Sequence, residues 1–208
     1  MSETARVPSA RQSELLERAY AYVLEHGLSG LSLRPLAAAI GSSPRVLLFL
    51  FGSKEGLVRQ ILARARADEL AFLAQARATP GQPGAPGQPG QDGLAQVTGT
   101  VWEWLADPAH RRLLTLWVEA YARSLAEPDG PWAEFASQTV ADWLAVLAAA
   151  QPAAQRDTPA AVAQRTLALA VLRGALLDLL ATGDAGRLTR AVTGYLLRLP
   201  GRVFSDSD

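Results

Sequence analysis

Apolar residues recur at helical spacing along most of this 208-residue chain. In the first such stretch, Leu15, Ala19 and Val23 lie four residues apart and so share one side of a helix. Ser9 precedes this stretch as a candidate cap, and Gly27 follows it as a left-handed stop. The pattern therefore predicts a helix between these two residues, and it predicts three more before the middle of the chain.

These three helices are marked by their end signals. Ser32, Ser43 and Ser53 each stand where a helix cap is expected, and each precedes a run with a one-sided apolar stripe. Pro35 and Pro44 fall in first turns, where a missing backbone N–H does no harm. The expected helices run from 33 to 40, from 44 to 51 and from 54 to 78, with glycines 41 and 52 ending the first two.

A Pro/Gly-rich segment over residues 79–93 interrupts the helical pattern. It carries four Pro-Gly pairs, which neither a helix nor a buried strand tolerates, and it predicts a solvated linker. Helical periodicity then resumes over 94–106, 109–126, 131–150, 159–182 and 185–199. The sequence therefore predicts an all-α fold of about nine helices. Residues 167–180 are apolar on nearly every side, so a core or a subunit interface must cover them.

Composition excludes several classes of protein. The chain is 49% hydrophobic and 19% charged, which is typical of a globular protein. The sequence predicts no apolar run that approaches the roughly 20 residues needed to span a bilayer. The polar first residues lack the order of a secretory signal, which favours a cytoplasmic protein without membrane contact. There are no cysteines, and the two histidines, His26 and His110, lack a regular metal-ligand spacing.

Charge is unevenly distributed on a chain whose formal net charge is zero. Residues 1–66 hold nine basic and five acidic side chains, an excess of four positive charges that the rest of the chain balances. A positive first third is a modest indication of a polyanionic partner such as DNA.

Two short predicted helices joined by a tight turn around Gly41 form a helix-turn-helix candidate. Helical hairpins are also common in bundles, so the pattern alone leaves both interpretations open. The block "SLRPLAAAIGSSPRVLLFLFGSKEGLVRQIL" narrows this choice, because it resembles the DNA-binding region of the TetR family of transcriptional regulators. The matching positions are Ser32, Leu36-Ala37, Gly41, Ser43, Phe51 and Gly52-Ser53-Lys54-Glu55 with Leu57.

The resemblance implies a domain division and a set of DNA contacts. The DNA-binding domain would span 1–53, with the start of helix four at 54–66, and a ligand-binding and dimerisation domain would span 67–208. Burial of Leu47 and Phe51 would turn Arg45, Val46 and Phe49 toward the major groove. Lys54 and Arg34 would contact phosphates. The expected DNA-binding residues are Ser32, Arg34, Ser42, Ser43, Pro44, Arg45, Val46, Leu48, Phe49 and Lys54.

Two positions depart from the family pattern. An aromatic residue, most often Tyr, usually stands where Leu48 does, and often a Tyr or His where Leu50 does. Leu has no hydroxyl for a phosphate, so backbone anchoring should be weaker and apolar base contacts more important. The main hypothesis is a DNA-binding transcriptional repressor that a small molecule releases from a palindromic operator. The alternative is a TetR-like ligand-binding or interaction protein with weakened or lost DNA binding.

The resemblance also implies a sensor domain and a homodimer. Aromatic residues favour an unknown small apolar or aromatic ligand, because no buried charge is evident from the sequence and Glu119 is expected to be solvated. The expected pocket residues are Trp102, Leu114, Trp117, Val118, Tyr121 and Trp143. The helices at 159–182 and 185–199 are expected to pair with their copies in a four-helix bundle, through Leu169, Leu172, Leu176, Leu179 and Leu180.

An enzyme is not expected. The chain has no cysteine, no G-x-S-x-G elbow, no G-x-G-x-x-G and no P-loop, since "GSKEG" lacks the required glycine spacing. The sequence therefore assigns no catalytic residue, no metal site and no cofactor.

Overall fold

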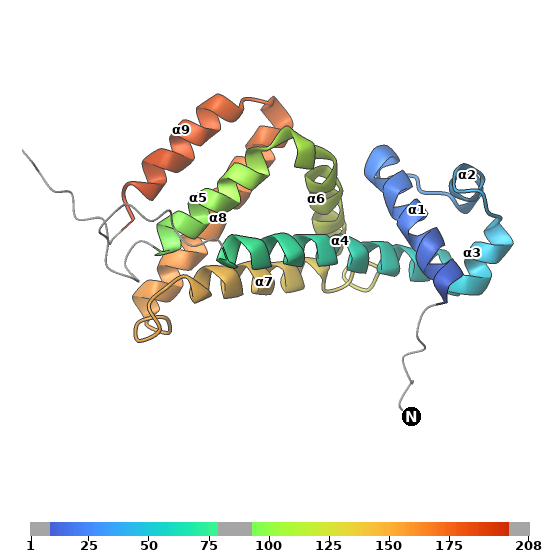
Figure 1. Cartoon of the computed structure of the whole chain (residues 1–208), viewed down its shortest axis with the longest axis horizontal. Helices are drawn as coiled ribbons and strands as arrows, with labels where there is room; N and C mark the ends of the chain where they lie inside the picture. The colour runs from blue at the N-terminus through green and yellow to red at the C-terminus, as the bar shows by residue number, and fades with distance from the viewer. Residues whose placement is uncertain (1–8, 79–92, 200–208) are drawn as a thin grey trace, which may run out of the picture. The chain divides into compact units, whose positions relative to one another are not determined.

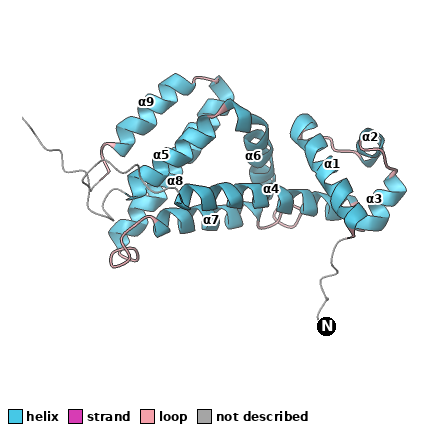
Figure 2. Ribbon diagram, in the orientation of Figure 1, coloured by secondary structure: helices cyan, strands magenta, loops and turns pink. Residues whose placement is uncertain are grey.

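The computed structural model describes residues 9–78 and 93–199, and within these ranges it contains nine α-helices and no strand (Figures 1 and 2). This confirms the predicted all-α fold. The predicted linker at 79–93 lies outside the described residues except for Gly93. The helices are α1 Ala10–His26, α2 Leu33–Ala39, α3 Pro44–Phe51, α4 Lys54–Ala78, α5 Gly93–Ala106, α6 Arg111–Ala126, α7 Phe135–Ala149, α8 Pro159–Thr182 and α9 Ala185–Leu196, with a short 3-10 turn, η1, at Pro108–His110 before α6.

Helix ends follow the predicted signals closely in the first part of the chain. Ser9 Oγ accepts a hydrogen bond from Gln12 N at 3.2 Å, and Ser53 Oγ accepts one from Gly56 N at 2.9 Å. Ser32 also stands at a cap position, but its side chain makes no capping hydrogen bond, contrary to expectation. The main difference in length is at α7, which begins at Phe135 rather than near residue 131 because the preceding residues form turns.

The chain divides into two compact units. The N-terminal unit comprises the chain up to Asp68 and Arg112–Ala136, and the C-terminal unit comprises Glu69–Arg111 and the chain from Ser137 onward. The sequence-based division, with its boundary after residue 66, did not foresee that most of α6 would group with the N-terminal unit. No sequence pattern announces such a grouping, because it depends on packing between residues more than 90 positions apart.

The core of the N-terminal unit is formed by one side of each of its first four helices. Leu15 and Val23 of α1, Leu36 of α2 and Leu47 of α3 are buried together with Ile61 of α4. At the edge of this core, Tyr20 Oη donates a hydrogen bond to Asp68 Oδ2 at 2.8 Å. Burial and this hydrogen bond raise the pKa of Tyr20. The contact therefore ties α1 to the middle of α4.

The end of α6 is held against the loop between α1 and α2. Glu119 accepts a hydrogen bond from the backbone N–H of Leu28 at 2.9 Å, and Arg123 donates one to Ser29 Oγ at 3.2 Å. Glu119 also lies 3.6 Å from Arg123 and its side chain is only 20% exposed. The expectation that Glu119 is solvated is therefore wrong. That expectation rested on helical spacing alone. Helical spacing cannot show that the backbone N–H of Leu28, in a distant loop, donates a hydrogen bond to this carboxylate.

Replacing Glu119 with Ala is expected to lower the free energy of unfolding by about 1–3 kcal/mol, because the part-buried N–H of Leu28 would lose its acceptor. Glu119→Gln keeps an oxygen at the same reach and should cost clearly less. Urea unfolding followed by circular dichroism measures both. Equal losses in the two variants would mean that charge, not the hydrogen bond, carries the effect.

The C-terminal unit is built around α5, α8 and α9, which pack against one another (Figure 1). Leu169, Leu172, Leu176 and Leu179 form the inner side of α8 and are each buried within the chain itself. The prediction that these four leucines contact a second copy is therefore corrected, because their surface is already covered. Leu180, the fifth residue of that set, is partly buried. A spacing of three and four residues marks a buried face but does not say which surface buries it.

The opposite side of α8 is apolar and uncovered within the described residues. Leu167 and Leu177 are each 54% exposed, and small residues stand between them along the same face. By length and hydropathy, α8 is also long and apolar enough to cross a membrane. This corrects the expectation that no segment of the chain would be long and apolar enough to span a bilayer. Core helices of soluble proteins can have the same length and hydropathy, and the inner side of α8 packs in such a core. The exposed face comprises Ala163, Leu167, Ala170, Gly174, Leu177 and Ala181.

Candidate nucleic-acid interface

Helices α2 and α3 form a tight helix-turn-helix within the N-terminal unit. Their axes bend by 101° across the residues between Ala39 and Pro44, within the range of roughly 90–120° typical of this motif. Gly41 takes a φ of 68° in the turn, a left-handed conformation that other residues rarely adopt. Ser42 N donates to Ala37 O at 2.8 Å, and Arg18 of α1 donates to Ile40 O at 3.2 Å. The turn is therefore fixed from both sides.

Helix α3 has two faces of opposite character. Leu47 and Phe51, one turn apart, are buried at 1% and 6% exposure, as predicted. On the other side Arg45 is exposed, and Val46, Leu48 and Phe49 are exposed at 38%, 43% and 85%. Packing explains only the buried pair. The exposed Phe49 indicates an interaction surface on α3, since large apolar side chains on the surface commonly mark interaction sites.

The end of α3 is joined to α4 by a segment that needs two glycines. Gly52 has a φ of 77° and ends α3, with its N–H donating to Leu48 O at 2.9 Å. Gly56, in the first turn of α4, lies so close to α3 that a Cβ atom there would collide with the carbonyl oxygen of Phe51. Sequence reasoning used Gly52 but missed Gly56. Its signal was a glycine inside a helix, which is unfavourable unless another part of the chain comes close.

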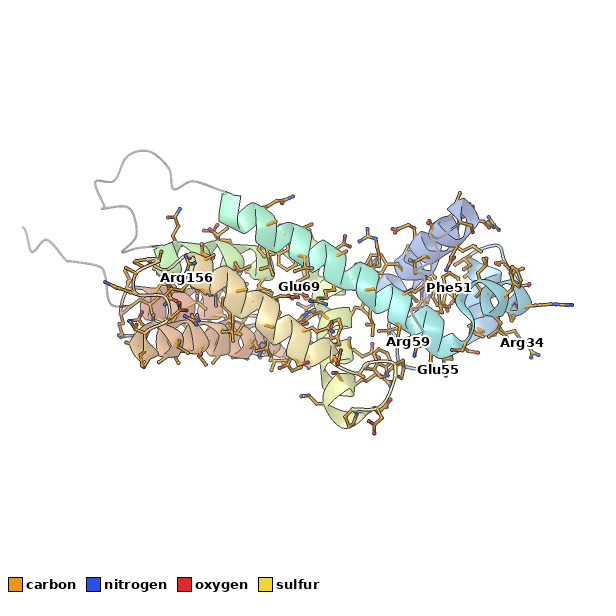
Figure 3. The ribbon with its side chains drawn as sticks, turned by 90° about the horizontal axis from the view of Figure 1, so that it is seen from below. Arg34, Phe51, Glu55, Arg59, Glu69 and Arg156 are labelled. Carbon is orange, nitrogen blue, oxygen red and sulfur yellow. The ribbon has the colours of Figure 1, made fainter. Side chains whose placement is uncertain are left out.

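Three cations stand on the surface around this motif. Arg34 lies at the start of α2, Arg45 at the start of α3 and Lys54 at the start of α4, and all three are exposed. None of them forms an ion pair within the described residues. Figure 3 shows Arg34 on α2, with Glu55 and Arg59 on the first turns of α4. Uncompensated cations at the starts of adjacent helices suit binding of phosphate groups.

The expected DNA-binding residues are distributed unevenly between surface and interior. Ser42 and Pro44 are partly buried, and the Ser42 hydroxyl oxygen is enclosed without a hydrogen-bond partner among the described residues. Ser42 is therefore corrected from a DNA contact to a residue of the turn. Ser43 is exposed, but its hydroxyl accepts from Val46 N at 3.3 Å as the cap of α3. The exposed members of the set are Ser32, Arg34, Ser43, Arg45, Val46, Leu48, Phe49 and Lys54.

This motif coincides with a known family of domains. Residues 15–61 match the model of the N-terminal domain of bacterial regulatory proteins of the tetR family. This segment therefore forms an N-terminal domain of the tetR type. Residues 15–61 cover most of α1, all of α2 and α3 and the start of α4, so the matched segment forms the helix-turn-helix and much of the core beneath it. No curated protein matches the chain.

Several solved structures share the fold over nearly the whole chain. A transcriptional regulator from Rhodococcus sp. Rha1 is 20% identical with a TM-score of 0.68, and 92% of this chain and 98% of that one are covered. Multidrug binding protein EbrR in complex with imidazole is 22% identical with a TM-score of 0.65, covering 97% and 100%. Salmonella enterica GusR is 23% identical with a TM-score of 0.59, covering 94% and 100%. The fold of the chain, including its C-terminal unit, is therefore shared with these solved structures.

The expected ligand-pocket residues do not fall in one unit. Leu114, Trp117, Val118 and Tyr121 belong to the N-terminal unit, whereas Trp102 and Trp143 belong to the C-terminal unit. Trp102 is buried and its indole N–H donates to Thr189 Oγ1 at 3.1 Å, which fixes α5 against α9. Trp117 stacks on Tyr121 with ring centroids 5.3 Å apart.

The C-terminal unit contains a buried carboxylate that sequence reasoning missed. Glu69 is 4% exposed and lies between α4 and α7 (Figure 3), where it accepts a hydrogen bond from the indole N–H of Trp143. The expectation of no buried charge is therefore wrong. The signal was present in α4, since Glu69 falls in the stripe formed by Leu62, Ala65 and Leu73.

The two histidines have structural surroundings. His26 Nδ1 lies 2.9 Å from Tyr22 O and its ring stacks on Tyr22, while His110 Nδ1 lies 2.9 Å from Trp104 O and its ring stacks on Trp104. Among the described residues there is no group of three His, Asp or Glu side chains that could hold a metal ion.

Proposed function

We propose that this protein is a transcriptional repressor of the cytoplasm that reads its operator with the exposed face of α3. The observation that carries this proposal is the division of α3, which buries Leu47 and Phe51 and leaves Arg45, Val46 and Phe49 facing outward. Packing within the chain accounts for the first pair and for none of the other three. A helix of this kind in a helix-turn-helix enters the major groove.

The exposed residues suit particular contacts. Arg45 can pair with the edge of a guanine, and Val46 and Phe49 can contact thymine methyl groups. Arg34 and Lys54 can hold phosphates on either side of the groove. Leu48 offers no group for a phosphate, so we expect few backbone contacts for a regulator of this family.

The operator is proposed to be palindromic and the protein a homodimer, because one α3 reads only a short half-site. The exposed face of α8 is the surface that we assign to this dimer. Its small residues, Ala163, Ala170 and Gly174, allow the backbones of two helices to approach closely, and Leu167 and Leu177 supply apolar area.

A small molecule bound by the C-terminal unit is proposed to release the operator. Related folds support this proposal, since EbrR has been crystallised with proflavin and with ethidium. The Trp143–Glu69 contact modifies the ligand expected from the sequence, because a carboxylate in an aromatic setting favours an aromatic ligand that also carries a hydrogen-bond donor or positive charge.

Operator binding measured against salt tests the DNA-binding proposal. Fluorescence anisotropy with the DNA upstream of the protein's own gene is expected to show saturable, sequence-dependent binding. The slope of log K against log salt should correspond to clearly fewer than about ten phosphate contacts. Lys54→Met should reduce this slope by about one contact, and Arg59→Met, on the same helix, should change it less.

The second candidate function is an interaction protein that does not bind DNA. The 85% exposure of Phe49, beside exposed Val46 and Leu48, favours it, because this surface is apolar for a DNA-binding helix. Binding to the upstream DNA without any preference over a scrambled duplex would support this candidate and contradict the repressor.

A further inference from the structure

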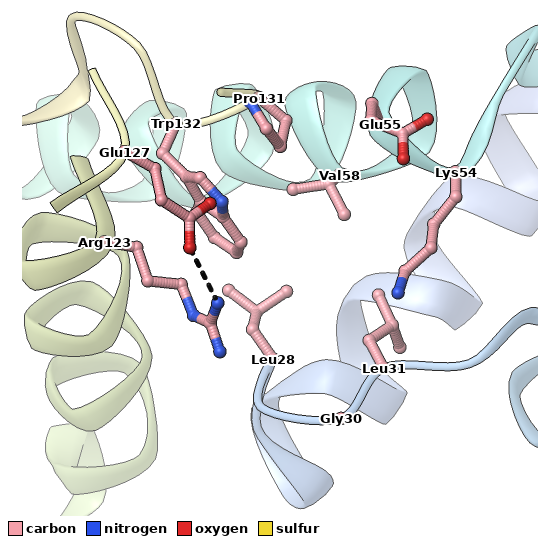
Figure 4. Close-up of a pocket in the computed structure, with 10 residues that line it drawn as sticks. All are labelled: Leu28, Gly30, Leu31, Lys54, Glu55, Val58, Arg123, Glu127, Pro131 and Trp132. Carbon is pink, nitrogen blue, oxygen red and sulfur yellow. Dashed lines mark ion pairs between the residues drawn. The ribbon is translucent and has the colours of Figure 1, made fainter. Parts of the chain in front are cut away.

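The N-terminal unit holds a cavity of about 230 Å³ at the start of α4. Figure 4 shows its wall, which combines the loop between α1 and α2, the first turns of α4, the end of α6 and the loop that follows α6. Pockets for drug-sized ligands usually measure roughly 300–1,000 Å³. A ligand of this cavity must therefore be smaller than those.

Four of the residues that line the cavity are buried apolar side chains, beside charged residues. Leu28 and Leu31 come from the α1–α2 loop, Val58 from α4 and Trp132 from the loop after α6. All four are at most 6% exposed, so they are held firmly in the core of the unit and cannot move aside readily. The cavity is therefore preformed on this side and suits an apolar or aromatic group.

The charges at one end of the cavity are already matched. Arg123 lies 3.6 Å from Glu127 and the same distance from Glu119, and it donates to Ser29. Its guanidinium also lies 5.2 Å from the ring centre of Trp132. The positive charge of Arg123 is therefore already balanced by these two carboxylates, and Arg123 is not the group that would bind an anionic ligand.

The other end holds a cation of a different kind. The ammonium group of Lys54 lies beside Leu31 (Figure 4) and has no ion pair within the described ranges. Its neighbour Glu55 also lines the cavity, but hydrogen bonds from its own backbone N–H and from the Ser53 hydroxyl lower the pKa of that carboxyl. Glu55 is thus held at the start of α4 as a charged carboxylate, and Lys54 remains the group that an incoming anion can meet.

We propose that this cavity is a second ligand site, which takes a small monocarboxylate with a short apolar or aromatic body. The carboxylate would bind the ammonium of Lys54, and the body would pack against Leu31, Val58 and the edge of Trp132. A charge-assisted hydrogen bond supplies the orientation, and the apolar side chains of the wall supply part of the contact area. The site lies wholly within the N-terminal unit and is separate from any ligand site of the C-terminal unit.

Occupation of this site has a consequence for DNA binding. A carboxylate on Lys54 neutralises a cation that we assign to a phosphate contact, so ligand and DNA compete for one side chain. This consequence rests on the proposed function, whereas binding of the monocarboxylate does not.

Calorimetry on the full chain without DNA tests the site directly. Phenylacetate is the probe, with 2-phenylacetamide and phenethylamine as neutral and cationic counterparts of nearly the same shape. Phenylacetate is expected to bind saturably, and the amide and the amine about tenfold or more weakly, the difference expected from one charge-assisted hydrogen bond. Equal binding of the acid and the amide would overturn the proposal, and so would no saturable binding of the acid.

Variants locate the binding. Lys54→Met should lose phenylacetate binding about tenfold or more, and Lys54→Arg should retain most of it, since a cation remains. Arg59→Met removes one positive charge from the same helix outside the cavity and should bind like the unchanged protein. Lys54 is exposed, so its replacement should leave the fold intact, which circular dichroism verifies. Unchanged binding in Lys54→Met would overturn the assignment.

A spectroscopic readout places the probe in the cavity. Phenylacetate should shift the indole N–H signal of Trp132, assigned by its absence in Trp132→Phe, and should leave that of Trp102 unchanged. A shift of other signals alone would place the probe elsewhere and contradict the proposal. Competition with operator DNA is then measured separately. Calorimetric binding without competition would refute only the DNA contact of Lys54, while DNA binding without calorimetric binding would refute only the cavity site.

Discussion

Truncation of Leu47 to Ala is expected to lower the free energy of unfolding of the N-terminal unit by about 2–5 kcal/mol. Leu47 is 1% exposed and lies at the centre of the buried face of α3, against a core contributed by α1, α2 and α4. A helix of only eight residues is not stable by itself, so its attachment depends on this anchor and on Phe51. The loss should appear in urea unfolding followed by circular dichroism.

The neighbouring Phe49 supplies the matched control. It is the larger side chain, but it is 85% exposed, so Phe49→Ala should change the free energy of unfolding by no more than about 0.5 kcal/mol. The same substitution should weaken operator binding, because the contact with thymine methyl groups is lost. Similar stability losses in the two variants would contradict the division of α3 into a buried and a reading face.

Arginine at position 177 is expected to convert the protein into a monomer. Leu177 is 54% exposed on the face of α8 that we assign to the dimer, and a second copy would bring it against an apolar surface. Burial of an unpaired charge there costs several kcal/mol, more than a dimer interface tolerates at one position. Size-exclusion chromatography with light scattering would show half the mass. Affinity for a palindromic operator should fall with it, because one subunit binds one half-site.

Leu125→Arg is the control for this experiment. Leu125 is 67% exposed on α6, in the N-terminal unit, so the same substitution there should leave the oligomeric state unchanged. If Leu177→Arg remains a dimer, the interface lies elsewhere on the chain. If both variants become monomers, the effect is one of added charge and not of the α8 face.

Most helix boundaries could be predicted because they depend on local chemistry. Ser43 caps α3 with its own hydroxyl, Pro44 fits the first turn, and Gly52 supplies the left-handed residue that ends it. Each of these effects acts within four residues. The predicted capping hydrogen bond of Ser32 is absent, although Ser32 stands at the cap position of α2. The position of a serine in the sequence does not by itself fix which group its hydroxyl bonds.

The candidate site was predictable only in part. Helical spacing separated Leu47 and Phe51 from Arg45, Val46 and Phe49, because a short helix on a core can bury only one side. It did not place the Ser42 hydroxyl inside the turn or reveal the close approach of Gly56 to α3. It also did not place Lys54 at a cavity whose other walls come from residues 28–31 and 123–132.

The sequence by itself determined the all-α fold, the positions of its helices and the face of each that must be buried, because periodicity and capping are local properties of the chain. Only the tertiary structure decided what covers each face. It buried the inner leucines of α8 within the chain itself, gave Glu119 a backbone N–H to accept from and enclosed Glu69 beside Trp143. These outcomes depend on which distant segments meet. The hydrophobic pattern of the sequence shows that a helix face must be buried, but it does not show which segment covers that face.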